Sequence, residues 1–167
     1  GRLLWNPKVG NTINDRLLHH NLVDVSVLDV GRSRMKFFTI TPTGATIMAE
    51  HGITITTVGP GSIEHEYWRS RLRQACELHG YVVTEEYGLD DRHRVDVHAT
   101  RDGRVLLIEI ETGKSNITDN IRKCEGQGEL LMFFTAKTAL DSVQQSIPSD
   151  VITLTPESLP QINIILN

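Results

Sequence analysis

The sequence lacks most of the features that mark a specialised class of protein. Its 167 residues include only two cysteines, Cys76 and Cys124, far apart and without the spacing of a zinc site or a disulfide framework. We therefore expect two reduced, buried thiols in an intracellular, cytoplasmic protein. No apolar run approaches the roughly 18 residues of a membrane span, and no signal peptide opens the chain, so we expect no membrane association. The abrupt start at Gly1-Arg2-Leu3 predicts a piece of a longer protein.

Charge of one sign is also missing. The formal net charge is −4, without the positive excess that often accompanies nucleic-acid binding. Residues 1–50 hold six Lys and Arg against four Asp and Glu, whereas residues 51–167 hold eleven against seventeen. An acidic metal site would contribute to the second imbalance, and so would ordinary surface carboxylates.

The composition is that of a globular chain, with 39% hydrophobic and 23% charged residues. The length suits one ordinary domain or two small ones. Gly59-Pro60-Gly61 is the strongest break in the pattern. We therefore expect two domains, residues 1–58 and residues 59–167.

The first part alternates in a way that predicts helix, hairpin and helix, over residues 11–20, 21–28 with 35–41, and 43–50. This order, with the Thr39-Ile-Thr-Pro-Thr-Gly44 string and a basic hairpin tip, resembles the C-terminal half of a winged-helix domain. Only ten residues precede the first helix, so the resemblance implies a truncated domain. In a winged helix the hairpin tip touches phosphate, which implies contacts from Arg32, Arg34 and Lys36. The alternative is a solvated hairpin that packs two domains together or forms a dimer.

The second part predicts the element order α-β-β-β-α-β-α-β. Ser62 begins a helix over residues 63–79. The expected strands are residues 81–87, 92–100, 104–112, 129–135 and 151–154, with helices over 116–126 and 137–146 and an edge strand over 162–166. We expect a mixed sheet.

Three acids fall on the two central strands of this pattern. Asp102-Gly103 is a strong two-residue hairpin turn, and a turn centred there places residue 96 opposite residue 109. Glu109 and Glu111 project to the same face because strand side chains repeat every two residues. Oxygen ligands of this kind favour Mg²⁺ or Mn²⁺. Alternatively, Glu109 pairs with Arg94 or Arg104.

The string Arg94-Val-Asp96 with Ile108-Glu-Ile-Glu111 resembles the PD-(D/E)xK nuclease superfamily, over about residues 62–154. The resemblance implies a restriction-endonuclease-like αβββαβ core in the α/β (α+β) class. It implies Glu66, Asp96 and Glu109 as metal ligands. Glu111 stands where the motif has lysine, as a ligand or a base that orients water, and Lys114 is the candidate for the missing cation. Members of the superfamily often work as homodimers.

A weaker similarity links Ile108 to Lys123 with nuclease-like modules of HerA-type ATPases and mobile-element proteins, which implies a larger chain or an ATPase partner. Arg69 and Arg73 are candidate phosphate contacts, or a solvated helix face. The seven histidines share no ligand spacing, so we expect surface or core roles, with an outer position beside Asp96 open for His98. The sequence thus predicts a Mg²⁺- or Mn²⁺-dependent endonuclease that hydrolyses duplex or branched DNA. The alternative is an inactive nuclease-fold module for DNA binding or assembly.

Overall fold

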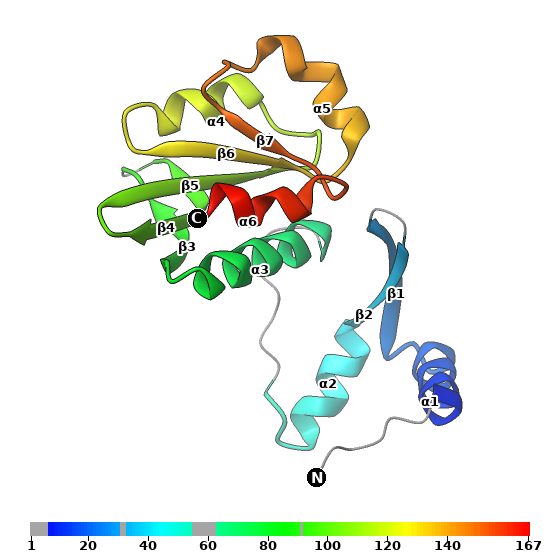
Figure 1. Ribbon diagram of the computed structural model, residues 1–167. Coiled ribbons are helices and arrows are strands. Elements are labelled where there is room, and N and C mark those ends of the chain that lie inside the picture. Colours follow the sequence, from blue (N-terminus) through cyan, green and yellow to red (C-terminus); the bar gives the residue numbers. More distant parts are fainter. Residues whose placement is uncertain (1–6, 31–32, 55–62, 91) are drawn as a thin grey trace. The chain divides into compact units, whose positions relative to one another are not determined.

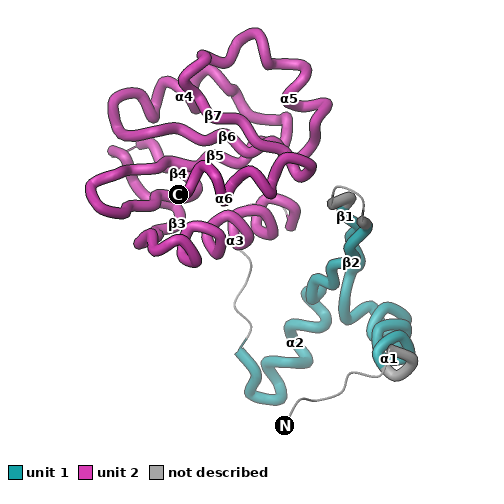
Figure 2. The backbone as a smooth tube through the Cα atoms, in the orientation of Figure 1, with its two compact units in different colours: residues 1–59 teal, residues 60–167 magenta. Residues whose placement is uncertain are grey.

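The chain adopts a mixed α+β fold in a computed structural model that describes residues 7–30, 33–54, 63–90 and 92–167. A five-stranded mixed sheet, a separate antiparallel hairpin and six α-helices make up the described part (Figure 1). This confirms the expected fold class. The chain divides into two compact units, residues 1–59 and 60–167 (Figure 2), and each is described by itself below. Within the described segments, no helix has both the length and the apolar character needed to cross a bilayer.

Unit 1 is built from a helix, a two-stranded hairpin and a second helix. These are α1 (Pro7–His19), β1 (Val23–Val30), β2 (Ser33–Ile40) and α2 (Pro42–Glu50). The helix α1 begins at Pro7, before the predicted residue 11, and proline is well tolerated in the first turn of a helix. The winged-helix assignment of this unit stays a prediction.

A threonine fixes the junction between the hairpin and α2. Thr41 Oγ1 accepts a hydrogen bond from Gly44 N at 3.1 Å and donates one to the Asn21 carbonyl at 2.6 Å. This caps the helix, because the first turn of a helix has unpaired N–H groups. Gly44 is required by close approach, since a Cβ there would lie 2.2 Å from the Leu22 carbonyl oxygen.

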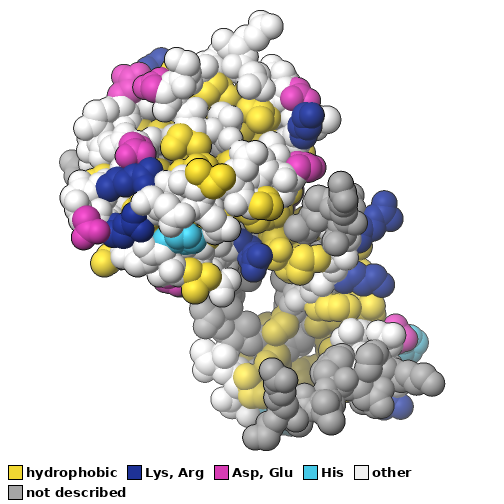
Figure 3. All heavy atoms as spheres, in the orientation of Figure 1, with side chains coloured by type: hydrophobic (Ala, Val, Ile, Leu, Met, Phe, Trp, Pro, Cys, Tyr) yellow, Lys and Arg dark blue, Asp and Glu magenta, His cyan; other side chains and the backbone are white. Residues whose placement is uncertain are grey.

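The hairpin of unit 1 leaves many apolar side chains exposed. Val25 lies opposite Phe38 in the ladder, and the exposed fractions are 43% for Val25, 54% for Val27 and 39% for Phe38. Hydrophobic side chains are visible on the face of this unit in Figure 3. A two-stranded hairpin is marginally stable alone, so unit 1 depends on α1 and α2 for its packing.

Unit 2 contains the sheet, in the spatial order β3-β4-β5-β6-β7. Strands β3 to β5 are antiparallel, and β6 and β7 continue parallel to β5. The predicted element order from α3 to β7 is confirmed. The elements are α3 (Ile63–Leu78), β3 (Val82–Gly88), β4 (Arg94–Arg101), β5 (Arg104–Glu111), α4 (Ile117–Cys124), β6 (Glu129–Phe134), α5 (Lys137–Val143), a 3₁₀ turn (Gln144–Ser146), β7 (Ile152–Leu154), a second 3₁₀ turn (Leu159–Gln161) and α6 (Ile162–Ile165).

The turn between β4 and β5 has the geometry that its sequence predicts. Asp102 and Gly103 have φ values of 51° and 84°, as a type I′ turn requires at both central positions. The ladder runs from Arg101 opposite Arg104 to Val97 opposite Ile108. The predicted register is therefore confirmed over these pairs, and it brings residues 96 and 109 to the end of the ladder.

The sheet is covered on both faces. On one face α3 packs across β3, β4 and β5, and Trp68 contacts Phe133 with ring centroids 4.7 Å apart. On the other face Leu107 and Met132 pack with Cys124 of α4 in a buried cluster. The continuous apolar run of β5 follows from burial on both sides. Glu109 and Glu111, the two acids of β5, are thereby held in a low-dielectric environment.

The C-terminal segment contradicts the sequence prediction. Residues 162–166 were expected to form an edge strand, but they form the short helix α6, and that prediction is wrong. Ile162 and Leu166 are four residues apart, and both are buried. Arg104 Nη1 donates a hydrogen bond of 2.8 Å to the Ile165 carbonyl. These tertiary contacts override the strand preference of the isoleucines.

Candidate functional site

The candidate site begins where β4 separates from its two neighbours. The ladder between β4 and β5 ends with the pair Val97 and Ile108. One residue beyond, the Asp96 carboxylate accepts a hydrogen bond of 2.8 Å from the backbone N–H of Ile110. On the other side, Glu86 has a φ of 49° and is left out of the ladder between β3 and β4. The side chain of Asp96 thus takes the place of a backbone partner at the point of divergence.

Glu109 is the most strongly perturbed carboxyl group of this site. It lies on β5 and is 4% exposed. Burial and repulsion from Asp96 raise its pKa from 4.5 to about 8, and the nearby Lys123 ammonium opposes that rise. Lys123 Nζ lies 3.0 Å from Glu109 Oε1. That distance is an ion-pair contact, and Glu109 Oε1 has no other polar partner among the described residues. The alternative pairing of Glu109 with Arg104 is wrong, because Arg104 binds Glu129 instead.

Helix α3 brings a histidine and a glutamate to the same place. His65 Nε2 lies 3.1 Å from Asp96 Oδ2, and the hydrogen bond to Asp96 raises the pKa of His65 against the opposing effect of burial. Glu66 Oε2 accepts a hydrogen bond of 2.5 Å from Arg69 Nη2. The other oxygen, Glu66 Oε1, is buried without a hydrogen-bond partner. Glu66 is therefore held by Arg69 through one oxygen, and among the described residues it is joined to Asp96 only through its neighbour His65.

Glu111 has contacts of a different kind. Its side chain is fully buried. It accepts hydrogen bonds from the Ser115 hydroxyl and, at 2.6 Å, from the Asn120 amide. A buried carboxylate is stabilised when its oxygens are satisfied in this way. Its predicted role as a ligand or base stays a prediction, and its contacts are with α4 and with the residue that precedes that helix's N-cap.

Lys114 lies outside the cluster. It follows Gly113, whose φ is 79°, in the exposed loop between β5 and α4. Among the described residues, no carboxylate forms an ion pair with Lys114. The site's cation instead comes from α4, since Lys123 is the lysine beside Glu109.

The acidic cluster has only some of the features that a divalent metal ion requires. Within the described segments, no group of three or more His, Cys, Asp or Glu side chains converges closely enough to hold an ion. Two buried carboxylate oxygens without hydrogen-bond partners do lie in the cluster, on Glu66 and Glu109. Mg²⁺ commonly keeps several waters and binds through one or two carboxylates. Asp96 and Glu109 are thus the carboxylates that could hold such an ion together with water, whereas a closed three-carboxylate cage does not fit the described residues.

The predicted nucleic-acid contacts differ in their surroundings. Arg32 lies outside the described residues, whereas Arg34 and Lys36 are exposed on β2. Arg69 is buried and bound to Glu66 and Glu86, which argues against a surface phosphate contact. Arg73 is partly exposed, with its Nε 3.5 Å from Glu85.

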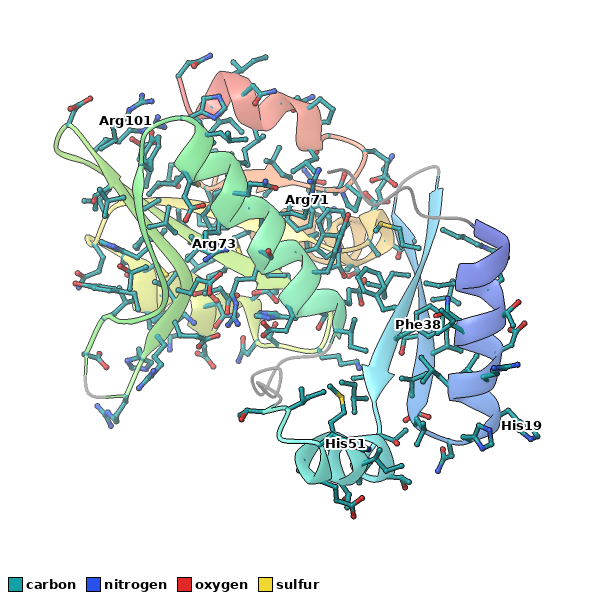
Figure 4. All side chains as sticks on the ribbon, turned by 90° about the horizontal axis from the view of Figure 1, so that it is seen from below. His19, Phe38, His51, Arg71, Arg73 and Arg101 are labelled. Atoms are coloured by element: carbon teal, nitrogen blue, oxygen red, sulfur yellow. The ribbon has the colours of Figure 1, made fainter. Side chains whose placement is uncertain are left out.

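Two features accompany these basic residues. Arg71 and Arg73 lie on α3 in Figure 4, which also shows Phe38 between the hairpin and α1. In unit 1, a pocket of about 480 Å³ lies between α1 and the hairpin. It is lined by Asn11, Asn14, Asp15, Leu18, Val25, Lys36 and Phe38.

Sequence reasoning missed two residues of the site. His65 was expected to be an ordinary histidine, and its position directly before Glu66 was the available signal. Lys123 was noted only as the end of the segment that is similar to modules of HerA-type ATPases and mobile-element proteins. His98, by contrast, stacks on Tyr87 with ring centroids 4.0 Å apart.

Comparisons with known proteins identify no family. No family model matches the chain, and no curated protein matches it. Two solved structures share parts of the fold. A protein of Vibrio cholerae, VC1899, has 13% identity and a TM-score of 0.43 over 93% of this chain and 41% of its own. Can2 of Sulfobacillus thermosulfidooxidans, in complex with cyclic tetra-adenylate, has 17% identity and a TM-score of 0.44 over 92% and 44%. The chain thus spans less than half of either neighbour, and similarities this weak carry no functional argument.

Proposed function

We propose that unit 2 is a nuclease-type domain that hydrolyses phosphodiester bonds in DNA with the help of Mg²⁺ or Mn²⁺. The observation that carries the proposal is the pair Asp96 and Glu109 at the divergence of β4 and β5. Burying two neighbouring carboxyl groups costs stability, and here it raises the pKa of Glu109 to about 8. Because proteins rarely retain such a cost without a compensating role, perturbed groups of this kind point to functional sites.

Each residue has a chemical role in this proposal. Asp96 and Glu109 would hold the metal, and Glu66 would orient water through its free oxygen Oε1. The bound metal would supply charge to the phosphate and lower the pKa of a water molecule. His65, 3.1 Å from Asp96, fixes the orientation of that carboxylate. The buried surroundings strengthen each of these electrostatic interactions.

A second function is favoured by a specific observation. Each carboxylate already lies beside a cationic or polar group: Asp96 beside His65, Glu66 beside Arg69 and Glu109 beside Lys123. A cluster compensated in this way can be purely structural. In that case the domain would keep the fold and serve as an inactive DNA-binding or assembly module.

A plasmid-nicking assay with Mg²⁺ or Mn²⁺ tests the first proposal. Asp96→Asn should lower the nicking rate by about 10²-fold or more, the loss expected when one key electrostatic group is removed. Asp102→Asn is the matched control, because the Asp102 side chain is 95% exposed and asparagine tolerates its positive φ. Equal nicking by the wild type and Asp96→Asn would show that the activity comes from a contaminant.

Metal binding is tested separately by thermal unfolding. Millimolar Mg²⁺ or Mn²⁺ should raise the melting temperature of the wild type and leave that of Asp96→Asn unchanged. DNA binding without nicking, together with no melting shift in the wild type, would favour the inactive module.

A further inference from the structure

Lys123 is placed unlike the exposed lysines of the described chain. Its side chain is 14% exposed and its ammonium lies 3.0 Å from the buried Glu109. Removing an ammonium group from water costs free energy unless a nearby opposite charge compensates for the lost hydration. Lys114 and Lys137, in contrast, are exposed. The position of Lys123 therefore calls for an explanation.

Glu111 explains how Lys123 is held there. The fully buried Glu111 accepts hydrogen bonds from Asn120, near the middle of α4, and from Ser115, just before that helix. Asn120 and Lys123 are three residues apart, so they share a face of the helix. Glu109 and Glu111 are two residues apart, so they share a face of β5. Two parallel contacts, Glu111 to Asn120 and Glu109 to Lys123, thus join one strand face to one helix face.

We infer that Lys123 is the catalytic cation of the site and that Glu111 is its positioning residue. The inference rests on the proposed function, because the cation matters only if phosphate is bound there. Glu111 occupies the position two residues after Glu109, and Lys114, the other nearby lysine, lies in an exposed loop without an ion pair to any described carboxylate. The helix α4 therefore delivers the positive charge that the strand itself does not.

In the proposed reaction, water displaces one ester oxygen from the phosphorus atom. The oxygen of a water molecule forms a bond to phosphorus, and the bond from phosphorus to one ester oxygen breaks. The attacking water loses a proton to solvent, and the leaving oxygen takes one from solvent. Negative charge builds up on the phosphate oxygens during the transfer, and the Lys123 ammonium stabilises it. Removing one such donor typically costs 10²–10³-fold in rate.

Nicking rates of the full 167-residue chain test the role of Lys123. Lys123→Met should lower kcat by about 10²-fold with little change in KM, because the additional negative charge builds up only in the transition state. Lys137→Met is the matched control and should be within twofold of the wild type. A large loss in Lys114→Met with none in Lys123→Met would overturn the assignment.

Chemical labelling tests the role of Glu111 without relying on activity. Brief acetylation followed by mass spectrometry should modify Lys123 several-fold more slowly than Lys137 in the wild type. Asn120→Ala and Glu111→Ala should remove this protection, and Glu111→Gln, which keeps an acceptor and a donor, should restore much of it. Protection that is unchanged in the folded Asn120→Ala variant, whose altered side chain is only partly buried, would overturn the positioning role.

The outcomes separate this inference from the proposed function. If the wild type nicks DNA and Asp96→Asn does not, while Lys123→Met is as active as the wild type, only the inference fails. If the wild type does not nick DNA with either metal, the proposed function fails and the catalytic part of the inference fails with it. The labelling result still decides whether Glu111 positions Lys123.

Discussion

Replacing Glu109 by glutamine should change how the stability of the fold depends on pH. Burial and the Asp96 carboxylate raise the pKa of Glu109 from 4.5 to about 8. Between these two values the folded chain keeps a proton that the unfolded chain has released. The stabilisation is therefore complete below about pH 4.5, and it is lost as the pH rises through 8. Glutamine carries no such proton, so the variant should not show this loss.

The size of the effect follows from the pKa. A difference of one pH unit in pKa corresponds to about 1.4 kcal/mol, so the rise to about 8 corresponds to about 5 kcal/mol at most. Part of this difference lies outside the range from pH 5 to pH 9, because the carboxyl group of the unfolded chain is already largely ionised at pH 5 and that of the folded chain is not completely ionised at pH 9. Relative to the wild type, Glu109→Gln should gain about 4 kcal/mol in free energy of unfolding between pH 5 and pH 9.

Urea unfolding in EDTA at pH 5, 7 and 9 measures this difference. Glu157→Gln, at an exposed position, is the control and should differ from the wild type by a constant amount. Adding Mg²⁺ at pH 8 should stabilise the wild type but not Glu109→Gln, because the metal binds the ionised carboxylate and folding is linked to that binding. A difference between wild type and Glu109→Gln that stays within about 1 kcal/mol from pH 5 to pH 9 would refute the reasoning.

Three further predictions concern the fold around the site. Leu72→Ala in the fully buried interior should lower the free energy of unfolding of unit 2 by about 2–5 kcal/mol in urea, and a loss below 1 kcal/mol would contradict its packing. Gly44→Ala, whose Cβ would lie 2.2 Å from the Leu22 carbonyl oxygen, should lower the hydrogen-exchange protection of unit 1 by about 1–3 kcal/mol; unchanged protection there would count against the close approach. Glu129→Gln should cost about 1 kcal/mol or less at pH 7, because Arg104 lowers the pKa of Glu129 and the pair is partly exposed. That stability is present above about pH 4.5 and is lost as the pH falls through the lower pKa of the folded chain, so a cost that persists at pH 2 would contradict the ion pair.

The features that the sequence predicted well are local or periodic. The β4–β5 register followed from Asp102-Gly103, because a two-residue turn with positive φ values fixes which residues face each other. The element order of unit 2 followed from apolar runs and helix periodicity, which burial on both faces of the sheet imposes. The sequence predicted that Asp96 and Glu109 lie close together, because the turn at Asp102-Gly103 fixes the register of both strands.

The features that could not be predicted from the sequence depend on contacts between residues that are distant in the chain. Lys123 reaches Glu109 only because α4 docks on one face of the sheet, and no periodicity in the sequence encodes that docking. His65 contacts Asp96 across α3 and β4 for the same reason. The segment that forms α6 is rich in isoleucine and predicts a strand, but Arg104 binds its last turn and two of its side chains are buried four residues apart. Local propensity therefore failed where tertiary contacts decided the outcome.

The balance of charge inside the cluster connects these observations. In the formal count, which takes histidine as neutral, Asp96, Glu109 and Glu66 are offset by Lys123 and Arg69, so these residues contribute only −1 to the net charge of the chain. A net charge of −4 is consequently no argument against a phosphate-binding role. The same balance of charge opposes metal binding, because an incoming Mg²⁺ must compete for Asp96 with protonated His65. A metal that binds here therefore does so more weakly as the pH falls. Such binding would distinguish a functional metal site from a cluster whose charges are balanced only by its own residues.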